Sequence, residues 1–147
     1  MNKKEQMQEL LKDTVDFYRE DPANRRSVTD DGDCMYTWGK KHCAIGRYMR
    51  DEYQDETWEN NNMSVNELAE RGLENDTEWN IDWCLIDKAQ GLDANFWGDL
   101  QDMHDTVGYW EEWHEHKDGV RDYKLTDLGK ERYVTLQDRI AEGKYDD

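Results

Sequence analysis

The sequence predicts a mainly helical α+β domain with one short β-hairpin. Apolar residues recur at three- and four-residue steps in several segments, a β-branched and aromatic run lies beside a glycine-containing turn, and only one proline occurs. Seven Trp and eight Tyr favour a folded chain, because disordered chains are poor in aromatic residues. A length of 147 residues fits one domain, so we expect residues 1–147 to fold as a single unit.

A helix is predicted over residues 4–19, because its apolar side chains fall on one face. The helix is predicted to end before Pro22, because proline disfavours helical conformation in the residue before it. A short hairpin comes next, with an aromatic run over 34–38 and Gly39 in its turn. The spacing over 43–49 then becomes helical. The apolar face of the first helix comprises Met7, Leu10, Leu11, Thr14, Val15 and Tyr18.

The following helix begins at a predicted capping box. Glu67 comes three residues after Ser64, and such a pair satisfies free backbone N–H groups at a helix start. The helix is predicted to end at Gly72. Residues 74–91 are ambiguous between a helix and an irregular packed segment.

Two helices are predicted in the last third of the chain. An apolar stripe over 92–107 has helical spacing. Residues 120–125 are predicted to form a short strand. Thr126 caps a C-terminal helix over 126–142, and Gly143 stops it. The stripe comprises Leu92, Phe96, Leu100, Met103 and Val107, and the inward face of the last helix comprises Leu128, Tyr133, Leu136 and Ile140.

Negative charge is concentrated in the middle of the chain. Residues 51–112 hold 18 Asp and Glu against only Arg71 and Lys88, a net charge of −16. Residues 1–50 have a net charge of +1 and residues 113–147 a net charge of −2. A solubilising coat is one interpretation, but solubility does not require this asymmetry.

An anionic surface repels nucleic acid and anionic membranes and attracts basic proteins. We therefore predict a non-enzymatic accessory protein, without cofactors, that binds a basic host partner. In its sharper form the hypothesis is nucleic-acid mimicry, in which carboxylates replace phosphates and inhibit a nucleic-acid-binding or defence protein. The tryptophans among these acids are either interface hot spots or buried aromatic residues of a small core. A further hypothesis is a homo-oligomer in which tryptophans of different copies contact each other. The predicted interaction residues are Asp51, Glu52, Asp55, Glu56, Trp58, Glu59, Glu74, Asp76, Glu78, Trp79, Asp82, Trp83, Glu111 and Glu112.

A thiol-based enzyme or metal/redox module using Cys34, Cys43 and His104 is the alternative. Cys43 lies at the start of a predicted helical segment and beside the basic stretch 40–42, and both features lower a thiol pKa. His104 would be its base. A free cysteine is more often a small buried residue, however, and His104 falls on the apolar side of its helix.

The sequence contains no typical metal-binding motif. Zinc sites usually contain closely spaced cysteine pairs, and none occurs here. Residues 76–87 space acids like a calcium-binding loop, but Ile81 stands where that loop requires glycine.

Several short motifs together resemble a family of small proteins from tailed phages and prophages. The family pattern is C-x-Y, then C-A-[IV]-G, then L-Q-x-x-H-D. The resemblance covers roughly residues 10–107 and implies a phage context rather than a particular activity. The acidic middle segment and the C-terminal helix depart from it. The matching residues are Thr14-Val15-Asp16-Phe17-Tyr18, Asn24-Arg25-Arg26-Ser27, Cys34-Met35-Tyr36, Cys43-Ala44-Ile45-Gly46-Arg47 and Leu100-Gln101-Asp102-Met103-His104-Asp105.

The sequence also bears on localisation. It contains no run of about 18 apolar residues, and the N-terminus enters an amphipathic pattern without an apolar signal stretch. Three cysteines fit reduced thiols better than a disulfide framework. We therefore expect a protein of the host cell cytoplasm that does not contact a membrane.

Overall fold

The computed structural model describes residues 2–20, 25–27, 35–38, 41–55, 57–59, 61, 63–74, 78–110 and 125–145. Their α-helices are α1 (Lys3–Glu20), α3 (Val65–Glu74), α4 (Ala94–Asp105) and α5 (Asp127–Ala141), and their strands are β1 (Thr37–Trp38) and β2 (Lys41–His42). Single 3₁₀ turns lie at Gly46–Tyr48, Asp51–Tyr53, Asp82–Cys84, Asp87–Ala89 and Val107–Tyr109. These elements confirm the predicted mainly helical α+β fold with one short hairpin.

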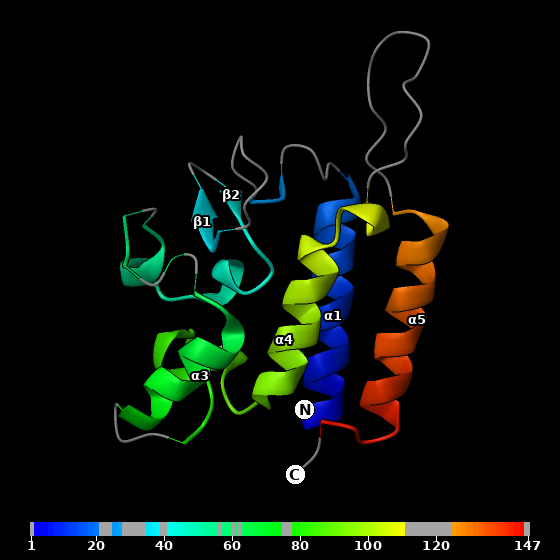
Figure 1. Ribbon diagram of the computed structural model, residues 1–147. Helices are drawn as coiled ribbons and strands as arrows, with labels where there is room; N and C mark the ends of the chain where they lie inside the picture. Colours follow the sequence, from blue (N-terminus) through cyan, green and yellow to red (C-terminus); the bar gives the residue numbers. More distant parts are fainter. Residues whose placement is uncertain are drawn as a thin grey trace, which may run out of the picture.

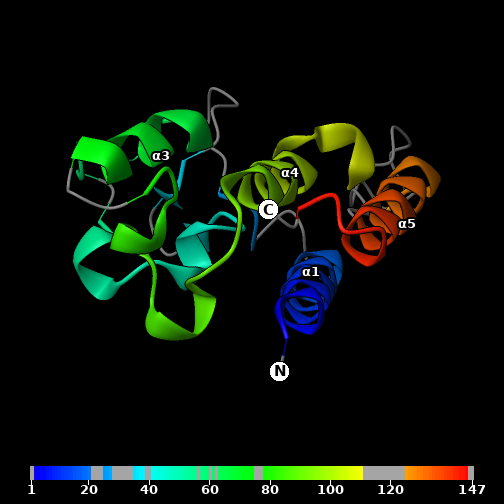
Figure 2. The same ribbon diagram turned by 90° about the horizontal axis from the view of Figure 1, so that it is seen from below.

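Helix α4 stands between two parts of the molecule. Helices α1 and α5 pack beside it and against each other (Figure 1). Helix α3 packs against α4 from the other side, together with the hairpin and the 3₁₀ turns between residues 46 and 89 (Figure 2). Helix α4 therefore contributes one face to the helical layer and another to the more irregular part.

The core lies on the faces that the apolar periodicity predicts. All six predicted apolar-face residues of α1 are buried. On α4, Phe96, Leu100 and Met103 of the predicted stripe are buried, with Trp97 beside them. Burying each large apolar side chain contributes about 1.5–3 kcal/mol. These two faces therefore hold the helical layer together.

The chain after the hairpin departs from the prediction. The helix expected over 43–49 is reduced to the single 3₁₀ turn Gly46–Tyr48. The chain becomes extended at Met49, which forms an isolated antiparallel bridge with Leu85. Long-range pairing thus prevails over the local helical spacing. The two-residue strands of the hairpin pair Thr37 with His42 and Trp38 with Lys41.

Helix α3 begins as predicted but ends later. The Glu67 backbone N–H donates to Ser64 Oγ at 3.2 Å, and the Ser64 N–H donates to the Glu67 carboxylate at 3.4 Å, which completes the capping box. The helix continues past Gly72, which is buried and is not one of the described glycines with positive φ. The ambiguous segment after it is irregular, with two 3₁₀ turns.

Helix α5 has the predicted caps. Thr126 Oγ1 accepts from the Gly129 N–H at 3.1 Å, and Gly143 has a φ of 76° after the helix end. Leu128 is 55% exposed, so its predicted inward position is wrong. Helix α5 approaches the 3₁₀ turn Val107–Tyr109 through Gly129, where a Cβ would lie 2.4 Å from the Tyr109 carbonyl oxygen. Residues 120–124 of the predicted strand lie outside the described residues. Among the described residues, no helix has the length and apolar character needed to cross a membrane.

Candidate functional site

An acidic lobe lies on the side of α4 away from α1 and α5. We define it as the described residues between Asp51 and Gly91. This stretch of sequence contains 12 Asp and Glu against two Lys and Arg, a net charge of −10. At its start, four carboxylates are exposed and have no Lys or Arg within 4.0 Å among the described residues. They belong to Asp51, Glu52, Asp55 and Glu59.

The predicted anionic surface is narrower than residues 51–112, because α5 neutralises part of α4. Asp99 forms ion pairs with Arg139 at 2.9 Å and with Arg132 at 3.6 Å. Asp102 lies 3.9 Å from Arg132. Two acids of α4 are therefore neutralised by α5, whereas the four carboxylates at the start of the acidic lobe have no such partner among the described residues.

The other predicted acidic residues are distributed more widely. Glu74 is exposed and lies 3.7 Å from Arg71, and Glu78 is exposed. Asp82 is half-buried and accepts hydrogen bonds from the Gly91 N–H, and burial raises its pKa above the ordinary value. The remaining predicted acids lie outside the described residues: Glu56, Asp76, Glu111 and Glu112.

The three predicted tryptophans of the lobe divide into two kinds. Trp58 and Trp83 are partly buried and pack with Tyr53, with ring centroids 5.0 to 6.2 Å apart. The Trp83 indole N–H also donates to the Leu68 carbonyl at 3.0 Å. Trp79 is 39% exposed. The first two thus join turns of the lobe that are distant in sequence, and Trp79 is available for contact.

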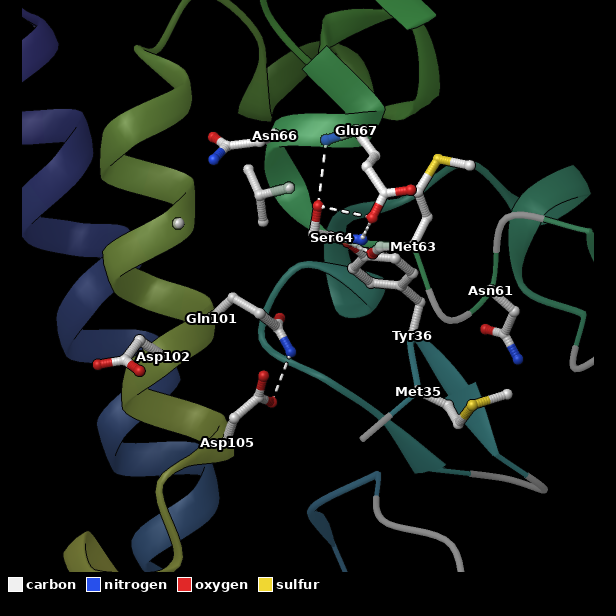
Figure 3. Close-up of a pocket in the computed structure, with 12 residues that line it drawn as sticks. Met35, Tyr36, Asn61, Met63, Ser64, Asn66, Glu67, Gln101, Asp102 and Asp105 are labelled. Carbon is white, nitrogen blue, oxygen red and sulfur yellow. Dashed lines mark hydrogen bonds between the residues drawn. The ribbon is translucent and has the colours of Figure 1, made fainter. Parts of the chain in front are cut away.

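A polar pocket of about 430 Å³ lies between α4 and the start of α3 (Figure 3). Helix α4 contributes Gly98 and three polar side chains one turn and two turns later, which share one helix face. The lining carries three carboxylates and three amides, and no Lys, Arg or His occurs among its described residues. Such a set favours ligands with positive charge and N–H donors. The lining residues are Met35, Tyr36, Asn61, Met63, Ser64, Val65, Asn66, Glu67, Gly98, Gln101, Asp102 and Asp105.

Hydrogen bonds fix the inner carboxylate of this pocket. The Gln101 side-chain amide donates to Asp105 Oδ1 at 2.7 Å, and both side chains project from α4 into the pocket (Figure 3). His104 Nδ1 lies 2.7 Å from the same oxygen. His104 Nε2 accepts from the Ser27 backbone N–H at 3.1 Å, so the ring proton is on Nδ1 and is donated to Asp105. Asp105 Oδ2 has no hydrogen-bond partner among the described residues.

Hydrogen bonds of the α3 capping box and of Tyr36, which precedes β1, fix the opposite wall of the pocket. Glu67 is kept in place by Ser64, whose hydroxyl lies 3.0 Å from its carboxylate. The Tyr36 hydroxyl donates to the Met63 carbonyl at 2.5 Å. The pocket therefore has a defined shape, built from side chains that are already hydrogen-bonded within the fold.

The thiol alternative gains no support from the described residues. Cys43 is fully buried, its sulfur accepts from the Gly46 N–H at 3.2 Å, and burial raises its pKa. The predicted lowering of this pKa is therefore wrong, because no α-helix begins at Cys43 and the thiol has no contact with solvent. Burial also raises the pKa of Cys84 to about 12. Cys34 lies outside the described residues.

His104 is a core histidine with both ring nitrogens hydrogen-bonded. It is fully buried, and burial lowers its pKa despite the opposing effect of Asp105. The Tyr18 ring packs against it at 5.0 Å. No group of three or more His, Cys, Asp or Glu that could hold a metal ion occurs in the part of the chain that the structure describes.

The polar pocket is the feature that the sequence analysis missed. The sequence did contain a signal for it: the spacing of Gly98, Gln101, Asp102 and Asp105 places these residues on one face of the helix, opposite the apolar stripe. The sequence did not show which segment covers this face. No known protein family, curated protein or solved structure matches the chain. The resemblance to phage proteins therefore stays a prediction.

Proposed function

We propose that this protein is a non-enzymatic binding protein whose acidic lobe contacts a basic partner protein. The exposed carboxylates of Asp51, Glu52, Asp55 and Glu59, which have no cationic neighbour among the described residues, carry this proposal. A field of uncompensated charge attracts a basic surface and accelerates its association. The exposed Trp79 in the same lobe would add apolar contact area.

Nucleic-acid mimicry is the more specific form of this proposal. Carboxylates would occupy the phosphate-binding surface of a host nucleic-acid-binding or defence protein and so inhibit it. The resemblance to phage proteins motivates a host target. A partner bound in this way would release the protein when duplex DNA is added, because both compete for one basic surface.

The test compares two charge-neutralised variants that lose the same number of charges. In the lobe variant, four exposed acids of the lobe are replaced by their amides. In the control variant, four exposed acids of α1, of α5 and of the α5 C-cap are replaced in the same way. The lobe variant is Asp51→Asn, Glu52→Gln, Asp55→Asn and Glu59→Gln, and the control is Glu9→Gln, Glu131→Gln, Asp138→Asn and Glu142→Gln.

The measurement is binding to a basic protein isolated from host lysate, at 0.05 M and 0.5 M NaCl. We expect the lobe variant to bind roughly tenfold or more weakly at low salt, and the control to bind within about twofold of wild type. High salt should weaken the wild-type complex strongly, since exposed charges are screened. Equal losses in the two variants, or binding that salt does not change, would contradict the proposal.

A further inference from the structure

Gly98 has no structural explanation within the fold itself. It lies in the interior of α4, where glycine is a poor helix former. It is not one of the described glycines with positive φ, so its backbone does not require glycine. A Cβ at this position would meet nothing within 4 Å, so packing does not require glycine either. Gly98 does line the polar pocket, and a Cβ there would stand in open space.

The pocket that Gly98 keeps open has the chemistry of a guanidinium site. Asp105 is held by Gln101 and His104 through Oδ1, which leaves Oδ2 as a fixed acceptor. Glu67 lies on the opposite wall, whereas the Asp102 carboxylate points away from Asp105 (Figure 3) and lies 3.9 Å from Arg132. Met35 and Met63 supply apolar surface for methylene groups. A volume of about 430 Å³ falls within the range of about 300–1,000 Å³ typical of ligand sites.

We propose that this pocket receives an arginine side chain of the basic partner, with Asp105 as the principal acceptor. This inference rests on the proposed function and identifies the contact that would anchor the partner. Arginine is favoured over lysine because the guanidinium is planar, presents five N–H donors and is weakly hydrated. The carboxylates of Asp105 and Glu67 on two walls suit several donors spread over one plane, whereas an ammonium is a compact and strongly hydrated charge.

The direct test titrates the full-length protein with acetyl-arginine amide and, separately, with acetyl-lysine amide. Backbone amide NMR shifts report where each probe binds. We expect shifts centred on Gly98, Gln101 and Asp105, with arginine binding at least about fivefold more tightly than lysine. Asp105→Asn should weaken arginine binding at least about fivefold. Equal binding of the two probes, or shifts spread evenly over the acidic lobe, would overturn the inference.

A second test blocks the pocket without changing any charge. Gly98→Leu should fill it, whereas Ala141→Leu places the same side chain on the exposed end of α5, away from the pocket, and serves as the control. We expect Gly98→Leu to weaken capture of the basic partner at least about tenfold and Ala141→Leu to change it less than about twofold. Far-UV circular dichroism checks that both variants fold.

The two proposals fail in different ways. If the lobe variant loses partner binding while Gly98→Leu binds like wild type, the pocket inference is wrong and the proposed function stands. If neutralising the lobe has no more effect than the control, the proposed function is wrong whatever the pocket binds. If Gly98→Leu does not fold, the probe titration of the wild-type protein still decides the inference.

Discussion

Replacing Gly46 with alanine should destabilise the fold by about 0.5–4 kcal/mol. A Cβ at this position would lie 2.1 Å from the Tyr36 carbonyl oxygen and 3.0 Å from its carbonyl carbon. The obstacle is backbone, so rotation of a side chain cannot relieve it. That same oxygen accepts the Cys43 N–H at 3.1 Å. The hairpin and the 3₁₀ turn after it must therefore separate.

Three contributions set this magnitude. Overpacking costs about 1–3 kcal/mol. Weakening the hydrogen bond between Cys43 and Tyr36 costs about 0.5–1.5 kcal/mol. The lower conformational entropy of alanine in the unfolded chain offsets about 0.4–1 kcal/mol of this loss of stability.

Equilibrium urea unfolding followed by tryptophan fluorescence measures the effect, since the chain has seven Trp. Gly98→Ala is the matched control and should stabilise by about 0.5–1 kcal/mol, because its added methyl meets no atom within 4 Å. If Gly46→Ala lowers the free energy of unfolding by less than about 0.5 kcal/mol, the assigned close approach is incorrect.

Three further predictions concern charge, thiols and pH. Raising NaCl from 0.05 to 0.5 M should raise the melting temperature by about 2–4 °C, because salt screens repulsion within a chain of net charge −17. Cys43 and Cys84 should be alkylated at least about a hundredfold more slowly in the native protein than in urea, as mapped by mass spectrometry, because both thiols are buried with raised pKa values. The stability difference between wild type and His104→Gln should shrink as pH falls from 7.5 to 5.5. Burial lowers the pKa of His104 below 6.5, so below that pH the unfolded state binds more protons and the stabilising contribution of the neutral ring is lost.

Each of these predictions has a result that would contradict it. The lobe variant should gain less from salt than wild type, and an equal gain would mean that the lobe acids do not dominate the repulsion. Rapid native alkylation of Cys43 would restore the thiol alternative. A His104→Gln difference that does not change with pH would mean that the ring does not titrate differently in the folded and unfolded states.

Local sequence determined most of the helical architecture. The apolar periodicity of α1 and of α4 repeats within a few residues, so each buried face follows from the order of side chains alone. The caps at Ser64 and Thr126 are equally local, because each bond joins atoms three residues apart. The concentration of negative charge was visible in the same way.

Only the tertiary structure decided which of these charges remain uncompensated. Asp99 and Arg139 are 40 residues apart, and no local pattern shows that they form an ion pair. The burial of Cys43 depends on elements packed around it, so its raised pKa could not be inferred from its basic neighbours in sequence. The pocket likewise forms because α3 and the hairpin close over one face of α4, which brings Glu67 opposite Asp105. Side-chain periodicity is a short-range property, whereas charge compensation, burial and cavities depend on residues that meet only when the chain has folded.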